Sequence, residues 1–137
     1  MKSQIILCSG GARSGKSEFA ERLALATEGR KAYVATGQAF DEEMIDRIKK
    51  HQERRGEIWN NFEVPLHLAK EWQNISQTAD VILIDCLTMF TTNHMMAHGS
   101  IQGQQDANQL EETVLTELET LLASIKSCEG KTVIFVT

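Results

Sequence analysis

Short apolar segments alternate with longer amphipathic segments along the chain. Four runs, residues 4–9, 31–36, 81–86 and 131–137, are nearly continuous in β-branched and aliphatic residues, as strands covered on both faces are. Between them, apolar residues recur at steps of three and four, as on one face of a helix. The clearest series is Leu110, Val114, Leu118, Leu121, Leu122 and Ile125. This alternation predicts an α/β protein with a mostly parallel sheet.

Glycines mark the limits of the last predicted helix. We expect this helix to begin about Asp106 and to end at Gly130, a residue suited to a C-cap. Residues 99–105 are polar and contain glycine, so they predict a loop. No helix follows the run 131–137, so we expect either a truncated chain or another segment that protects a sheet edge.

Composition narrows the function classes. The 137 residues have a net charge of −5, 42% hydrophobic residues and one proline, which predicts one globular domain over residues 1–137 and argues against a nucleic-acid binder. No apolar stretch reaches the ~18 residues of a membrane span, and no cleavage site follows the first residues, so we expect a cytoplasmic protein. The three cysteines lack CxxC spacing and predict free thiols.

A phosphate-binding loop follows the first predicted strand. The sequence GGARSGKS fits GxxxxGK[ST] and leads into a helix that we expect to begin near Lys16. In such loops the backbone N–H groups surround phosphate oxygens, the lysine reaches a terminal phosphate and the serine ligates Mg²⁺. The expected nucleotide-binding residues are Gly10, Gly11, Ala12, Arg13, Ser14, Gly15, Lys16 and Ser17. The predicted fold is therefore P-loop NTPase-like, of the RecA-like kind, with helices flanking the sheet.

The third apolar run ends in a carboxylate, Asp85. Beside a phosphate loop, such an acid approaches the metal ion or its water shell. We therefore predict a metal site at Ser17 and Asp85; the alternative is a solvated acid at a strand end.

A histidine lies among cations in the helical run 41–55. One interpretation is a solvated, charged helix. The other is that the cations hold phosphates beside a neutral, nucleophilic imidazole at His51, because nearby positive charge opposes histidine protonation. These cations are Arg47, Lys49, Lys50, Arg54 and Arg55.

Motifs in a fixed order resemble one enzyme family. They are GGARSGKS at 10–17, Ala35-Thr36, DEEM at 41–44, Arg47-Ile48, His51, Trp59, Glu63, Pro65, DCLT at 85–88 and Asn93. This pattern resembles bifunctional adenosylcobinamide kinase/adenosylcobinamide-phosphate guanylyltransferases, which assemble the nucleotide loop of coenzyme B12.

The resemblance implies two reactions. The first phosphorylates the aminopropanol hydroxyl of adenosylcobinamide, and the second transfers GMP from GTP to adenosylcobinamide phosphate through a guanylyl-histidine. It implies GTP, or ATP as an alternative phosphate donor, with Mg²⁺, a homotrimer, and catalytic roles for His51 and Lys16. It further implies a guanine nucleotide site at Ala35, Thr36, Gly37, Gln52, Glu53, Arg54, Arg55, Glu63 and Asp85. Asp85 therefore has two open roles, metal support and guanine contact.

The chain departs from the family pattern in particular residues and in length. Gly56 replaces an expected proline, and Asn60-Asn61 stand near an expected threonine. The family also continues past residue 137 into a helix and a strand that help to form the corrinoid site, which predicts a C-terminally truncated domain here. Two rival hypotheses follow: a P-loop kinase of another small metabolite, and a nucleotide-binding fragment without catalytic activity.

Overall fold

One sheet, in the order β1-β5-β4-β2-β3, forms the centre of the molecule. The computed structural model describes residues 1–11, 13–38 and 40–137. All four strand pairings within this part of the chain are parallel, which confirms the predicted α/β class and the sheet type. The strands are β1 (Gln4–Cys8), β2 (Lys31–Ala35), β3 (Trp59–Glu63), β4 (Val81–Asp85) and β5 (Thr132–Val136).

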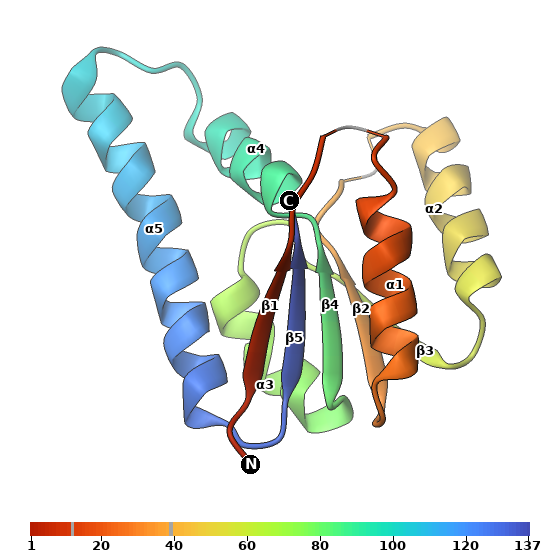
Figure 1. Ribbon diagram of the computed structural model, residues 1–137. Coiled ribbons are helices and arrows are strands. Elements are labelled where there is room, and N and C mark those ends of the chain that lie inside the picture. Colours follow the sequence, from red (N-terminus) through yellow and green to blue (C-terminus); the bar gives the residue numbers. More distant parts are fainter. Residues whose placement is uncertain (12, 39) are drawn as a thin grey trace.

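Helices cover both faces of this sheet. They are α1 (Lys16–Ala26), α2 (Glu42–Arg55), α3 (Leu68–Thr78), α4 (Leu87–His98) and α5 (Gln104–Ser127). Figure 1 shows α1 on one face with α2 beyond it, and α3 and α5 on the opposite face. Among the described residues, no helix is both long and apolar enough to span a membrane.

The central strands pack into two apolar layers. Ile82 and Ile84 point toward α3 and α5, whereas Leu83 between them packs toward α1. All three are at most 1% exposed. Burial of each such side chain stabilises the fold by about 1.5 to 3 kcal/mol, which explains why β4 reads as a continuous apolar run.

The edge strands differ from the expectation. The four predicted strands are present to within one residue at each end, but β1 is not covered on both faces: Ile5 and Leu7 are 39% and 60% exposed. The reason is that β1 is an edge strand that pairs only with β5. Strand β3 is not among the predicted strands, because its residues WNNFE include two asparagines, which are rare in strands. Pairing with β2 stabilises β3 in place of strand propensity.

The limits of α5 also need correction. The helix ends at Ser127, with Cys128 as the C-cap, and Gly130 lies in the following turn, where its N–H donates to the Met1 carbonyl at 2.8 Å. A positive φ of 73° explains the glycine there. At the other end α5 begins at Gln104, earlier than predicted. The Asp106 carboxylate in its first turn accepts the Gln102 N–H at 2.8 Å and fixes that end.

An ion pair closes the end of the sheet opposite the phosphate loop. Asp80 Oδ2 accepts both the backbone N–H and the Nε–H of Arg30 at 3.0 Å. These hydrogen bonds hold the pKa of the Asp80 carboxyl well below its usual range. The charged form is therefore favoured in the folded state, and its stabilisation is present above the ordinary aspartate pKa of about 4.

We therefore predict that Asp80→Asn lowers the free energy of unfolding by about 1 kcal/mol at pH 7. This loss should shrink as the pH falls below about 4, since the Asp80 carboxyl of the unfolded chain then binds a proton while the folded carboxylate stays ionised. Denaturant unfolding of both proteins between pH 7 and 2.5 measures it, with the exposed Glu112→Gln variant as control. A loss that is independent of pH would contradict the prediction.

Candidate functional site

The phosphate loop connects β1 to the N-terminus of α1. Gly15 is the N-cap of α1, with a φ of 81° and no side-chain cap, so the first N–H groups of the helix can meet an anion. A side chain at Gly10 would place a Cβ only 2.7 Å from the Ser14 Oγ. Lys16 Nζ donates to the Gly10 carbonyl at 2.8 Å, across the loop. Ala12 lies outside the described residues.

Two cavities adjoin this loop. The larger, about 900 Å³, lies beside β1 and is lined in part by the predicted loop residues Gly10, Arg13, Ser14, Gly15 and Lys16. Arg13, Lys16 and Arg22 give its wall more positive than negative charge, since Glu18 is the one acidic residue in the lining. Such a wall suits an anionic ligand.

The smaller cavity, about 390 Å³, brings together residues from four separate segments of the chain. Its lining includes the predicted residues Ser17, Ala35, Gly37, His51, Arg54, Arg55 and Asp85. Sequence reasoning missed six further lining residues, which are Glu18, Glu21, Tyr33, Ile48, Cys86 and Met89. Periodicity could have found Ile48, which precedes His51 by about one helical turn, and Tyr33, which shares a strand face with Ala35.

Parallel pairing explains why these segments meet. The last residues of the five strands, Cys8, Val136, Asp85, Ala35 and Glu63, form one register row. The side chains of such a row point to the same face of the sheet, here the face that α1 covers. Glu63 is exposed and lies one strand beyond Ala35, outside both cavity linings. Neither lining includes Gly11, Thr36, Gln52 or Glu53.

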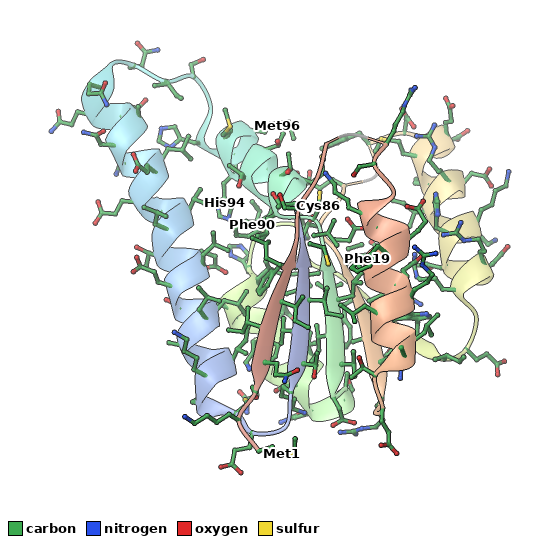
Figure 2. The ribbon with its side chains drawn as sticks, in the orientation of Figure 1. Met1, Phe19, Cys86, Phe90, His94 and Met96 are labelled. Carbon is green, nitrogen blue, oxygen red and sulfur yellow. The ribbon has the colours of Figure 1, made fainter. Side chains whose placement is uncertain are left out.

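The predicted nucleotide residue Thr36 is fully buried. Its hydroxyl donates to the Cys86 carbonyl at 2.7 Å and accepts the Cys86 N–H at 2.9 Å. Asn93 Nδ2 donates to the Thr36 carbonyl at 2.6 Å and to the Pro65 carbonyl at 3.1 Å. Figure 2 shows Cys86 at the junction of β4 and α4, with Phe90 and His94 further along α4. These bonds fix the segment that follows Asp85.

A buried tyrosine donates a hydrogen bond to Asp85. The Tyr33 hydroxyl donates to Asp85 Oδ2 at 2.5 Å, and the Tyr33 ring meets the edge of Trp59 with 5.8 Å between centroids. Burial, followed by the charge of Asp85, raises the pKa of Tyr33 far above its usual value, so this hydroxyl remains a donor at neutral pH.

His51 lies on the exposed helix α2. The Asp41 side chain caps the helix by accepting the Met44 N–H at 2.8 Å, and Gly56 ends it with a φ of 78°. His51 lines the smaller cavity together with Ile48 and Arg55 of the same helix.

The oxygen donors suit a hard cation. Ser17 and Asp85 line the same cavity, and Mg²⁺ is usually held by one or two side-chain oxygens together with phosphate oxygens and water. No group of three or more His, Cys, Asp or Glu side chains in the described ranges is placed to hold a metal ion. Ser17 and Asp85 therefore fit a magnesium ion in the kind of oxygen donor that they offer.

A GxxxxGKS loop that leads from a parallel strand into a helix defines the class of P-loop nucleotide-binding proteins. Within that class, a family model described as cobinamide kinase / cobinamide phosphate guanyltransferase matches residues 6–137. The chain belongs to this family.

Curated relatives agree with the assignment. The bifunctional adenosylcobalamin biosynthesis protein CobU of Escherichia coli (strain K12) is 33% identical over 132 residues, covering 95% of this chain and 72% of the relative. The protein of the same name from Salmonella typhimurium (strain LT2) is 35% identical over 135 residues, with the same coverage. The bifunctional adenosylcobalamin biosynthesis protein CobP of Pseudomonas aeruginosa is 41% identical over 103 residues, covering 74% of this chain and 60% of the relative.

The Thr36 contact gives a testable prediction. Thr36→Val keeps the volume but leaves the Cys86 N–H without its buried acceptor and the Cys86 carbonyl without its donor, which should lower the free energy of unfolding by about 1 to 3 kcal/mol. Thr36→Ser keeps the hydroxyl and should lose less. Denaturant unfolding measures both, and a loss in Thr36→Ser as large as in Thr36→Val would contradict the prediction, since only the valine variant removes the hydroxyl.

Proposed function

We propose that this chain is a nucleotide-dependent transferase of adenosylcobalamin biosynthesis. It would phosphorylate adenosylcobinamide and then transfer GMP from GTP to adenosylcobinamide phosphate. Family membership and the names of the relatives support the reaction class. The observation that most supports the residue assignment is that His51 lines one cavity with Ser17, the residue that follows the phosphate-loop lysine.

The phosphate loop and His51 suit different phosphates of one nucleotide. P-loops grip the β- and γ-phosphates. In guanylyl transfer these two phosphates leave together as pyrophosphate, so the grip of Lys16 and of the α1 N-terminus stabilises the leaving group. The α-phosphorus is then left for His51.

The guanylyl transfer divides into two displacements. A nitrogen of neutral His51 attacks the α-phosphorus of GTP, a P–N bond forms, and the P–O bond to the β-phosphate breaks with release of pyrophosphate. A phosphate oxygen of adenosylcobinamide phosphate then attacks the same phosphorus, and the P–N bond breaks. The imidazole leaves as a neutral group, since its other nitrogen is protonated in the intermediate, and adenosylcobinamide-GDP is the product.

In the kinase reaction the same loop serves another phosphorus. The aminopropanol hydroxyl of adenosylcobinamide would attack the γ-phosphorus of GTP or ATP and lose its proton to solvent. An O–P bond forms, and the P–O bond to the β-phosphate breaks with release of the nucleoside diphosphate. Lys16 balances negative charge in this transfer as well. His51 has no covalent part in it.

We assign the metal ion and the guanine base to different side chains. Ser17 and Asp85 would hold Mg²⁺, which when bound neutralises phosphate charge. Glu63 lies in the same register row as Asp85, two strands away, so the two backbone positions are roughly 10 Å apart. That separation suits Glu63 for the far end of the nucleotide, where its carboxylate would accept the N–H groups of the guanine edge. Thr36, Gln52 and Glu53 remain predicted nucleotide contacts, as the homotrimer remains a predicted assembly.

The test is covalent labelling. With Mg²⁺ and GTP labelled at the α-phosphate, the denatured wild-type chain should retain acid-labile label, and His51→Ala should retain none. His67→Ala, which removes another exposed histidine, should label like wild type. Label from γ-labelled GTP on a small-molecule acceptor without label on the protein would favour the ordinary P-loop kinase. GTP binding without either transfer would contradict the proposed function.

A further inference from the structure

Helix α2 is loosely packed for an element that presents a nucleophile. None of its residues is buried. Two of its ion pairs, Arg47 with Glu43 and Lys50 with Asp46, are internal to the helix and cannot hold it against the sheet. In the part of the chain that the structure describes, its side chains make polar contacts with other elements only through Arg54 and Arg55.

The Arg54 contact is weak. Arg54 Nη2 lies 3.7 Å from Glu21 Oε2 on α1, beyond hydrogen-bond distance, and 62% of the Arg54 side chain is exposed. Exposed ion pairs of this kind contribute little to structure.

Arg55 makes much closer contacts. Its guanidinium carbon lies 3.6 Å from the centroid of the Tyr33 ring, and its Nη2 donates to Asn61 Oδ1 at 2.8 Å. The first contact is a cation–π interaction, which is stronger where water is excluded. The second extends to β3, so one side chain joins the end of α2 to two neighbouring strands.

The surface beneath Arg55 is rigid. Tyr33 is held at its hydroxyl by Asp85 and at its ring by Trp59, which is 5% exposed. An arginine stacked on such a ring has few alternative positions. His51 precedes Arg55 by four residues, so the two side chains lie on the same side of the helix, about one turn apart.

We infer that Arg55 is a positioning residue: its stacking on Tyr33 and its bond to Asn61 fix the end of α2 and so set where His51 stands in the cavity. This inference rests on the proposed role of His51 as the nucleophile. It differs from the direct nucleotide contact that the family resemblance implies for Arg55, because here the guanidinium is engaged by the protein itself. Its Nη2 is bonded to Asn61 and its guanidinium stacks on Tyr33, while its Nε is buried without a hydrogen-bond partner among the described residues.

Arg55→Met tests the inference, since it keeps an unbranched apolar stem and removes both contacts. A displacement of about 1 Å at a reacting group can slow a reaction about 100-fold. We expect the rate of His51 guanylylation at saturating GTP to fall by about that factor, with the Kd for GTP changed less than about threefold. Arg55→Lys keeps a cation over the ring and should lie between wild type and Arg55→Met. Asp46→Asn, which breaks only an internal pair of α2, is the matched control and should label like wild type.

A second measurement does not depend on the chemistry. Hydrogen exchange of the α2 amides should be faster in Arg55→Met than in wild type, while the α1 amides exchange at the wild-type rate. A fall in GTP affinity with an unchanged rate at saturation would overturn the inference and make Arg55 a nucleotide ligand. An unchanged labelling rate would also overturn it. If the wild-type chain binds GTP but His51 never takes up label, the proposed function fails, and hydrogen exchange of α2 alone tests the role of Arg55. Faster exchange in Arg55→Met then supports that Arg55 fixes the end of α2, and unchanged exchange refutes it.

Discussion

Parallel pairing is the constraint on which the candidate site depends. Because all five strands run in one direction, each delivers its last residue and the following loop to the same edge of the sheet. The phosphate loop after β1, the segment after β2 and the acid that ends β4 meet there without any long insertion. Short hydrogen bonds then fix the segments at this edge relative to one another. The chief ones join the Thr36 hydroxyl to the Cys86 backbone and the Asn93 amide to the carbonyls of Thr36 and Pro65. The buried strands supply stability, and this edge supplies the chemistry.

The two parts of the site are held in different ways. Ser17 and Asp85 belong to the first turn of α1 and to the end of β4, and the packing of the sheet fixes both. His51 belongs to a helix without a buried residue, and its place over the cavity depends on one arginine stacked on one tyrosine. A nucleophile on a loosely packed helix suits a reaction in which the histidine must meet first GTP and then a second, bulky phosphate acceptor. The difference between the firmly packed Ser17 and Asp85 and the less packed His51 therefore matches the two transfers proposed above.

Much of the fold could be predicted from the sequence, because buried strands and the GxxxxGKS loop are local signals. Strand β3 could not, since its asparagines oppose strand formation and only pairing with β2 stabilises it. Within the candidate site, the loop residues, His51 and Asp85 are predictions from motifs and family resemblance. Tyr33, Glu21 and the contact of Arg55 with Tyr33 were missed, because they depend on which helix crosses which strand, and no spacing along the chain encodes that crossing. Thr36 was predicted at the site, but the structure gives its side chain a bond to Cys86 that no motif indicates.

In the proposed reaction the phosphate loop and His51 act on a single nucleotide, the loop on the leaving pyrophosphate and the histidine on the α-phosphorus. The most direct measurement is the rate of His51 labelling from α-labelled GTP in a Lys16→Met variant, over a range of GTP concentrations. We expect labelling to fall by orders of magnitude even at saturation, because Lys16 stabilises the leaving group. Labelling at the wild-type rate, with the wild-type dependence on GTP concentration, would mean that His51 receives its nucleotide elsewhere and not from the phosphate loop.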